Sequence, residues 1–480
     1  MLRPTIVFSG MLTLVLGVSS GPMPALAQPT TQVLVDRGLP HGDFGAPARI
    51  VSLREDRALG ATIVIFSSGA RLIVKRTHHS PGQVSVLASF GAGRAGVPER
   101  LVHALWATTL FPLGGTAHLS YADIDAWQKE SGHPVNVTLV PAASAFRLEG
   151  NVPSGELNAE LELLAAYAHE PGFRGDLAAK ITNVAPMLAT QIEADPAARF
   201  TRDVQHRLVG ARYQELPEQE DLSATTGTEM PEILALSFAM APEIAIVGDI
   251  EVEAAVREVA ATLAAGAPRS VQHGRLPKVA ASPSGPPSGP TAPTEKPDTM
   301  RSGIYWRLPD FRAKPSTLRV ARVAAALIEA RLARIGSFGS DPASPPVAKA
   351  IVPIDLIGGG FLGIVVETRG GTTTNARDTV GGLLRDLGLG QFTDDELERA
   401  RQTVDAEHGA EVEDEAWWAQ RLGAALRDRQ VAQALAADVS VVVVDRGAVA
   451  AFVRGYLRGV APVAVVAEKI EVNTDKGGLK

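Results

Sequence analysis

The sequence predicts an α+β fold of two similar domains, each a mostly antiparallel sheet with helices packed on one face. The chain has 480 residues, 45% of them hydrophobic and 21% charged, so it can bury more than one core. Residues 144–167 and 361–387 both run strand, short turn and amphipathic helix, about 215 residues apart. A repeat of that length indicates domain duplication, with a sheet and its covering helices in each copy.

The first residues of the chain, 1–27, predict a secretory signal peptide. Arg3 precedes an apolar run from about Ile6 to Val18, and Ala25-Leu26-Ala27 matches a cleavage site of small residues. The apolar run is shorter than the roughly 20 residues that a membrane-spanning helix needs. We therefore expect cleavage after Ala27, export to the periplasm, and no membrane span in the mature chain. Residues 28–58, rich in Pro, Gly and charge, predict a loosely ordered lead-in.

The first domain is expected over residues 59–275. Two apolar runs within residues 61–77 flank Ser67-Ser68-Gly69, which predicts a hairpin whose glycine supplies positive φ. Pro98 suits the first turn of a helix that starts near Val97. Further strands are expected at 83–93, 133–140, 144–150 and 243–248, and helices at 155–171, over most of 173–240 and after Gly248.

Residues 276–300 predict a linker between the domains. The stretch ASPSGPPSGPTAPTEKPDT holds six prolines and mostly small residues, so it cannot form a core. A flexible linker of roughly 20 residues spans about 25 Å, which would let the two halves hinge.

The second domain is expected over residues 301–472, with a tail at 473–480. A capping box from Thr393 to Glu396 predicts one helix start within it. Helices are expected at 315–336, 372–388 and 393–409, and strands at 349–357, 360–370 and 460–470.

Composition excludes several functions. The net charge is −7 without a block of like charges, which argues against nucleic acid as a partner, because phosphate binding needs a concentrated basic surface. The chain has no cysteine, which excludes disulfides, thiol catalysis and cysteine-based zinc sites.

Two glycine-containing turns are weak candidates for nucleotide binding. The turn at Gly248-Asp249 lacks the three spaced glycines of a dinucleotide fingerprint, and Gly358-Gly359-Gly360 lacks the Lys and Ser/Thr of a phosphate loop. Structural turns are the favoured interpretation of both. No G-x-S-x-G occurs, so the sequence gives no sign of a serine hydrolase elbow.

Two histidine-containing stretches also have a functional and a structural interpretation. His78-His79 follows a predicted strand and is expected to be a solvated tip. His408, Glu411 and Glu415 could share a helical face and weakly resemble metal ligands, but a solvated acidic face is the favoured interpretation.

The order of these elements resembles that of the pitrilysin/insulinase family of zinc peptidases, the inverzincins. SSGARLIVK resembles the opening hairpin of that family, and IVGDI with its helix resembles the end of its first domain. TDDELERAR at 393–401 is similar to a recurring helix start in the second domain. The resemblance covers residues 58–470 and implies a fold like that of the mitochondrial processing peptidase.

Active members of this family carry H-x-x-E-H on the helix after the second sheet strand, with two histidines on zinc and the glutamate as base. The matching stretch here is RLVHALWATTLF, residues 100–111, with His103 as its single histidine. If His103 is the first ligand, Trp106 and Ala107 stand at the base and the second ligand.

In the other register, Glu99 and Val102 stand at the first ligand and the base. Neither register supplies two imidazoles and a carboxylate, so no zinc is expected in this chain. We expect His103 to be packed, or to lie at a helix edge.

The resemblance is to the zinc-free half of the family, such as the C-terminal half of bacterial periplasmic members. That half often carries an Arg and, several residues on, a Tyr that reach toward the substrate. In ARLARIGSFGSDP, Arg334 can take the Arg role, but Phe338 stands nearest to the Tyr position. Phe cannot donate the hydroxyl hydrogen bond that would stabilise an oxyanion, which puts a transition-state role in doubt.

The resemblance implies a non-catalytic, zinc-free subunit of a periplasmic metallopeptidase, which closes the chamber and binds unstructured peptide. Its partner would be a catalytic H-x-x-E-H homologue, and zinc, the only cofactor of such a complex, is expected in that partner alone. The alternative is a stand-alone peptide-binding or assembly protein of the same fold. An active zinc peptidase is the third possibility, disfavoured by the missing ligands.

Overall fold

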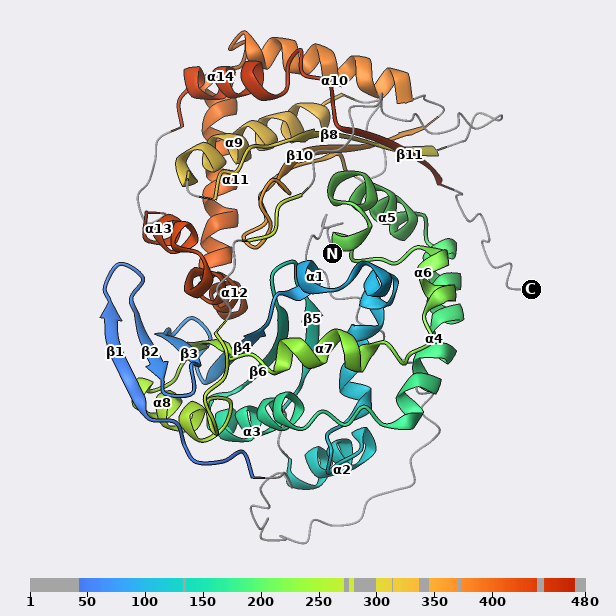
Figure 1. The fold of residues 1–480 in the computed structure, drawn as a ribbon. Coiled ribbons are helices and arrows are strands. Elements are labelled where there is room, and N and C mark those ends of the chain that lie inside the picture. Colours follow the sequence, from blue (N-terminus) through green and yellow to red (C-terminus); the bar gives the residue numbers. More distant parts are fainter. Residues whose placement is uncertain are drawn as a thin grey trace, which may run out of the picture.

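The computed structural model describes residues 43–132, 135–271, 276–279, 299–312, 314–335, 345–369, 373–437 and 444–470. The expected signal peptide, the tail, Phe338 and most of the expected linker lie outside these residues. The strands of the described chain form two sheets, one from each half of the sequence (Figure 1).

The first sheet has seven strands in the order β1-β2-β3-β7-β4-β6-β5. All neighbouring strands pair antiparallel except β3 and β7, which pair parallel. Its strands are β1 (Ile50–Asp56), β2 (Ala61–Phe66), β3 (Arg71–Arg76), β4 (Gln83–Phe90), β5 (Thr138–Pro141), β6 (Phe146–Pro153) and β7 (Glu243–Gly248).

The second sheet has four antiparallel strands in the order β11-β8-β10-β9. They are β8 (Thr299–Arg307), β9 (Val347–Ile351), β10 (Phe361–Arg369) and β11 (Ala464–Ile470). This order repeats the β7-β4-β6-β5 part of the first sheet, strand for strand in chain order. The predicted fold class is confirmed: two similar domains, each with a mostly antiparallel sheet.

Helices connect equivalent strands in the two halves. The first half contains α1 (Gly93–Gly96), the 3₁₀ helices η1 (Glu99–Gly114), η2 (Ser154–Glu156) and η3 (Ala211–Tyr213), α2 (Tyr121–Ser131), α3 (Leu157–His169), α4 (Gly175–Ala194), α5 (Pro196–Val209), α6 (Gln219–Ala224), α7 (Met230–Phe238) and α8 (Val252–Ala261). The second half contains α9 (Pro315–Leu332), α10 (Thr373–Gly388), α11 (Asp394–Val412), α12 (Glu415–Arg427), α13 (Arg429–Ala437) and α14 (Arg446–Tyr456).

Each sheet packs one face against helices of its own half. In the first half, Phe66, Phe90 and Leu148 of the sheet share a core with η1, α3 and α8. In the second half, Ile304 and Ile364 pack with α9, α10 and α14. The predicted layer of helices on one face is therefore present in both domains.

The opposite face of each sheet is covered by a helix of the other half, which the sequence did not predict. Leu422 of α12 and Val431 of α13 pack with Leu87 and Val247 of the first sheet. Conversely, α5 packs against the second sheet, where Phe200 shares a core with Tyr305 and Phe361. In Figure 1, α12 accordingly lies beside the strands of the lower half and α5 beneath β11.

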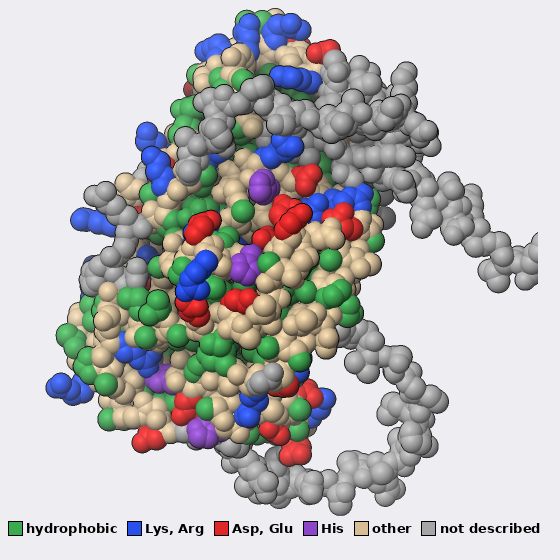
Figure 2. Space-filling model, turned by 45° about the vertical axis from the view of Figure 1, so that its right-hand side comes forward, with side chains coloured by type: hydrophobic (Ala, Val, Ile, Leu, Met, Phe, Trp, Pro, Cys, Tyr) green, Lys and Arg blue, Asp and Glu red, His purple; other side chains and the backbone are tan. Residues whose placement is uncertain are grey.

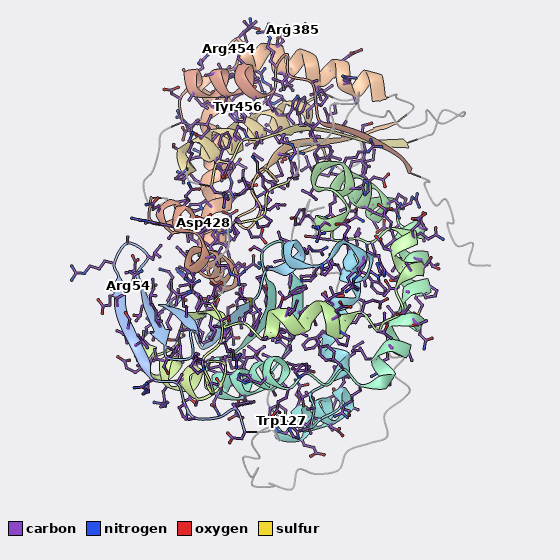
Figure 3. All side chains as sticks on the ribbon, in the orientation of Figure 1. Arg54, Trp127, Arg385, Asp428, Arg454 and Tyr456 are labelled. Carbon is purple, nitrogen blue, oxygen red and sulfur yellow. The ribbon has the colours of Figure 1, made fainter. Side chains whose placement is uncertain are left out.

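The packing of the two halves corrects the expectation that they hinge about the linker. Polar contacts add to the apolar ones: Ala143 N donates to Asp355 Oδ2 at 2.9 Å, and Arg307 Nη2 donates to the Leu208 carbonyl at 2.9 Å. Asp428, next to the C-terminal end of α12, lies at this junction (Figure 3). The two domains form one packed unit.

Strands occur in two segments that the sequence predicted to lack them. The expected lead-in, residues 28–58, contains β1 in its described part, because the backbone of Ile50–Asp56 pairs with β2 even though its side chains are mostly exposed. β8 begins at Thr299, inside the expected linker, and is a central strand of the second sheet.

Neither the charge distribution on the surface nor the hydrophobicity of the helices indicates a binding site. Figure 2 shows acidic and basic side chains interspersed across the middle of the face it presents. Among the described helices, none is both long enough and apolar enough to cross a bilayer. Candidate sites must therefore come from local clusters of side chains.

Candidate functional site

The segment that matches the zinc-binding helix of the resembled family is η1, a 3₁₀ helix. Its register buries Leu105, Ala107 and Phe111 in the first core. Two residues four apart, the spacing of the two histidines in H-x-x-E-H, differ by about 40° around an α-helix. They differ by about 120° around a 3₁₀ helix, which has three residues per turn. Besides lacking the second histidine, η1 therefore has a backbone that would not align such a pair.

His103 is half-buried in η1 and faces one carboxylate. Its Nε2 lies 3.7 Å from Glu229 Oε1. Three residues on, Trp106 is buried and its Nε1 donates to Thr225 Oγ1 at 3.0 Å. The base position of one register is thus occupied by a packed indole. Within the described ranges, no three His, Asp or Glu side chains gather in a way that could hold a metal.

Arg334, the expected substrate-binding residue, lies just beyond the C-terminal end of α9. Its side chain is 56% exposed, and Nη1 is 2.9 Å from Glu396 Oε1. Glu396 also pairs with Arg331 and belongs to the capping box that starts α11 with Thr393, as predicted. Hydrogen bonds from Arg331 and from the Thr393 backbone, together with the charges of the two arginines, lower the pKa of Glu396 to about 2.

The histidine and glycine turns have structural roles. His78 is 67% exposed with Nδ1 3.4 Å from Asp249 Oδ1, which confirms a solvated tip. Gly248 is required because a Cβ there would lie 2.3 Å from the carbonyl oxygen of Gln83. Gly358-Gly359-Gly360 lies in the connection between β9 and β10, as the structural interpretation predicts.

The expectation of a solvated acidic face at His408, Glu411 and Glu415 is wrong. Glu415 is buried at the start of α12 and accepts hydrogen bonds from Ser80 N at 2.9 Å and Ser80 Oγ at 2.8 Å. It therefore anchors α12 to the turn after β3, in the other half. His408 and Glu411 lie together on α11, with Nδ1 and Oε2 3.5 Å apart.

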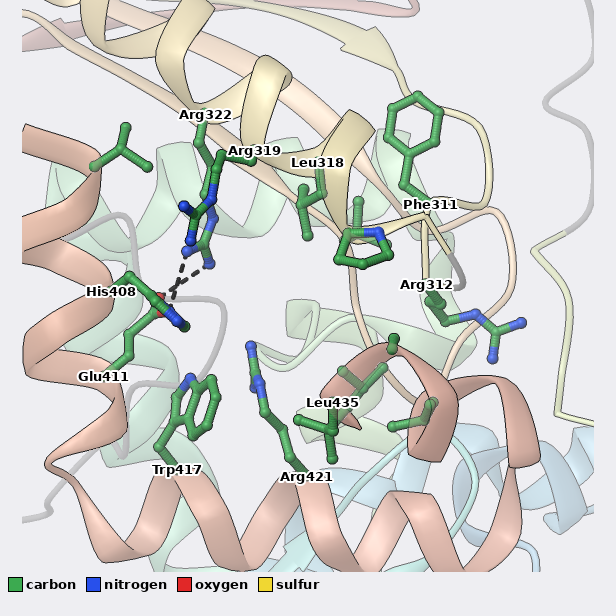
Figure 4. A pocket seen from close by; sticks show the side chains of 16 residues that line it. Phe311, Arg312, Leu318, Arg319, Arg322, His408, Glu411, Trp417, Arg421 and Leu435 are labelled. Carbon is green, nitrogen blue, oxygen red and sulfur yellow. Dashed lines mark hydrogen bonds and ion pairs between the residues drawn. The ribbon is translucent and has the colours of Figure 1, made fainter. Parts of the chain in front are cut away.

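His408 and Glu411 line a pocket between α9, α11, α12 and α13. The pocket is partly open to solvent, and the centre of a water-sized sphere can occupy about 80 Å³ of it. Figure 4 shows Arg319 and Arg322 reaching into it from α9, and Trp417 and Arg421 from α12 on the opposite side. Both Arg322 Nη atoms donate to Glu411, at 3.0 and 3.1 Å.

The pocket has one carboxylate and several cations. Burial alone would raise the pKa of Glu411, but the hydrogen bond from His408 and the charge of Arg322 outweigh it and lower the pKa to about 2. Glu411 is the single carboxylate among the lining residues, which include four arginines and His408.

Sequence reasoning missed this pocket, although two local signals point to it. Arg319 and Arg322 are three apart on α9, so they share a face. Trp417 and Arg421 are four apart on α12, a spacing that allows the guanidinium to stack on the indole. What could not be read from the sequence is that these two faces meet.

Comparisons with known proteins place the fold. No model of a known protein family matches the sequence, and neither does any curated protein. The structure is similar to a mutant of the ferredoxin protease FusC, solved in complex with Arabidopsis ferredoxin, with a TM-score of 0.64 and 13% identity over 92% of this chain. It is also similar to the periplasmic protease PqqL from Escherichia coli, with a TM-score of 0.62 and 13% identity over 93% of this chain.

The chain spans about half the length of both proteases, since the match covers 48% of each. A third similar structure is a peptidase M16 inactive domain from Pseudomonas fluorescens, with a TM-score of 0.63 and 14% identity. That match covers 85% of this chain and 97% of the other. The chain thus has the fold of M16, or pitrilysin-like, peptidases, which confirms the resemblance predicted from the sequence.

Proposed function

We propose that this chain is a zinc-free, non-catalytic subunit of a periplasmic insulinase-type metallopeptidase complex, where it closes the chamber and binds peptide. One observation carries the proposal. The segment equivalent to the zinc helix is a 3₁₀ helix with a single half-buried histidine, His103, whose ionic neighbour is Glu229. In active members of the resembled family the equivalent segment supplies two histidine ligands, whereas here it supplies one.

The partner is inferred from the length of the matched proteins. PqqL is a periplasmic protease about twice as long as this chain, and the Pseudomonas fluorescens structure is an inactive M16 domain. Because the chain matches about half of such a protease, its proposed partner is a half that carries H-x-x-E-H. Export of this chain rests on the apolar run and cleavage site of residues 1–27.

A stand-alone peptide-binding protein of the same fold is the second candidate. A conserved protein from Enterococcus faecalis, matched over 100% of its length, has a similar structure, as does a protease from Helicobacter pylori, matched over 98%. Such a protein would bind peptide without raising the activity of any homologue.

The first prediction concerns zinc. The purified mature chain should contain less than about one-tenth of a zinc ion per chain by elemental analysis and should leave an unstructured peptide uncleaved, because η1 lacks the ligand set. One zinc per chain, together with chelator-sensitive cleavage that His103→Ala abolishes, would refute the proposal.

The second prediction concerns the partner and Arg334. Addition of this chain to an H-x-x-E-H homologue from the same periplasm should raise peptide turnover, and Arg334→Ala should reduce the gain. Arg331→Ala is the matched control, because Arg331 shares the ion pair with Glu396 but is only 21% exposed. If Arg334→Ala and Arg331→Ala reduce the gain in peptide turnover equally, Arg334 has a structural role and does not contact the substrate. No gain from the unaltered chain would favour the stand-alone protein.

A further inference from the structure

The pocket between α9, α11, α12 and α13 has two chemically different sides. On one side stand Arg319, Arg322, Arg421 and His408, and on the other Phe311, Leu318, Val352 and Leu435. Arg312 lies beside Phe311, where Asp310 and Asp428 hold its guanidinium (Figure 4). Pockets that hold small ligands commonly combine apolar walls with a few convergent polar groups, and both kinds of lining are present here.

The cationic side holds more positive than negative charge. Arg322 forms a two-pronged ion pair with Glu411, and Glu411 also faces His408. The nearest carboxylate to Arg319 is Asp405, 3.5 Å away and 56% exposed, so water weakens that pair. The Arg319 side chain itself is only 13% exposed. An additional anion placed between the two helices would therefore be stabilised.

Arg421 and Trp417 extend this side from α12. The Arg421 guanidinium lies 4.0 Å from the centre of the Trp417 ring, and Figure 4 shows it pointing toward Arg319 and Arg322 across the pocket. Trp417 Nε1 is buried and has no hydrogen-bond acceptor within the described part of the chain. Because an indole N–H can only donate, and a buried donor without an acceptor is costly, this atom indicates that an acceptor binds here.

The apolar side selects among anions. Phe311, Val431 and Leu435 are buried. Their side chains have no hydrogen-bond donor for a phosphate or a sulfate. A carboxylate that carries an aliphatic or aromatic side chain matches both sides at once, since arginine can hold a carboxylate with two parallel hydrogen bonds. The C-terminal residue of a peptide has this chemistry.

We propose that this pocket binds the terminal carboxylate and apolar side chain of a peptide that ends in a residue such as leucine or phenylalanine. The assignment deepens the proposed function, on whose peptide ligand it rests. The carboxylate lies among Arg319, Arg421 and Trp417 Nε1, and the side chain lies against Leu318 and Leu435.

The third prediction tests this site by isothermal titration calorimetry on the full mature chain. N-acetyl-leucine, the smallest probe with both groups, should bind in a one-to-one ratio, and N-acetyl-leucinamide should bind at least about tenfold more weakly, because it lacks the charge. Arg421→Gln should weaken binding of the acid about tenfold without changing that of the amide. Arg54→Gln is the control, because Arg54 is 58% exposed on β1 and points away from the molecule (Figure 3).

Arg319→Gln, from the opposite helix, keeps the test valid if Arg421→Gln fails to fold, and circular dichroism reports the folding of both. Equal affinity for acid and amide would overturn the inference, as would competition by inorganic phosphate as strong as that of N-acetyl-leucine. A decapeptide that binds equally well with a free or an amidated C-terminal leucine would overturn the pocket assignment while leaving peptide binding intact. Binding of N-acetyl-leucine that depends on Arg421 supports the site even if no catalytic partner is found.

Discussion

Glu160 is a fully buried carboxyl group in the core of the first domain. It lies on α3 and is 0% exposed, packed against Gly150 of β6. Its Oε2 accepts a hydrogen bond from Asn136 N at 3.1 Å, whereas Oε1 has no partner within the described residues. Burial raises the pKa of Glu160 to about 8, and the hydrogen bond from Asn136 only partly opposes this. The group is therefore protonated in the folded protein at neutral pH.

The fourth prediction follows from this pKa. Between pH 4.5 and 8 the folded state binds a proton at Glu160 that the unfolded state has released, so the free energy of unfolding falls as the pH rises through this window. The contribution is complete below pH 4.5 and lost as the pH passes about 8. Each unit of pKa shift corresponds to about 1.4 kcal/mol, so the loss is on the order of a few kcal/mol.

Urea unfolding of Glu160→Gln across this pH range checks the prediction. The glutamine cannot titrate, so the pH slope should flatten relative to that of the unaltered chain. Glu162→Gln, on the same helix, is the control and should keep the slope, because Glu162 accepts a hydrogen bond from Asn158 at an exposed site. A slope that is unchanged in Glu160→Gln would show that Glu160 is not the group responsible.

Individual residues show where sequence reasoning stops. Two features were predictable: the absence of H-x-x-E-H around His103, and the capping box that Thr393 forms with Glu396. Each depends on residues within a few positions of one another. Glu415 was not, because its partner Ser80 lies 335 residues away in the chain. The same holds for Arg421, which looks like a solvated charge until α12 is placed opposite α9.

At the scale of elements, α5 and α12 are equivalent helices that the two halves exchange. Each begins at an aspartate N-cap, Asp195 and Asp414, whose side chain accepts a hydrogen bond from the backbone two residues on at 2.8 Å. Each then crosses to the sheet of the other half. At the end of α12, Arg427 and Arg71 of β3 both pair with the buried Glu243 of β7.

The fifth prediction tests whether α12 couples the two domains. Leu422 is fully buried against the first sheet, so Leu422→Ala should destabilise the protein by about 2–5 kcal/mol. The unfolding curve should stay a single transition, because the helix belongs to both cores. Leu389→Ala, at a leucine that is 56% exposed, should change the stability by less than about 0.5 kcal/mol.

Urea unfolding followed by circular dichroism and by tryptophan fluorescence measures this coupling. Two separate transitions, of which Leu422→Ala moves only one, would contradict it.

Elements with a strong internal pattern were predictable, and those defined by long-range pairing were not. The hairpin of β2 and β3 and the β10–α10 unit follow from periodicity and turn residues. β1 has little apolar alternation and depends on pairing with β2, and β8 depends on β10 and β11 on its two sides. Such strands acquire their environment from neighbours that are distant in the sequence.

The arrangement of the whole molecule corrects the role of the linker. The composition of residues 276–300 still predicts a proteolytic site, since Pro, Gly and Ser cannot build a core there. α12 and α13 pack on the first sheet, and α5 packs on the second. These contacts hold the two halves together without the covalent connection through residues 276–300. A hinge motion between these two domains would therefore have to break both sets of contacts.

Limited proteolysis with a protease of broad specificity should accordingly cut first between residues 280 and 299 and give two fragments that elute together in gel filtration. Separation of the fragments should need urea at a concentration close to the unfolding midpoint of the intact chain, because the interface has to be disrupted. Leu422→Ala should lower that concentration, whereas Leu389→Ala should not. Fragments that separate in buffer alone would contradict the exchanged helices, and first cuts within residues 100–260 would contradict the position of the linker.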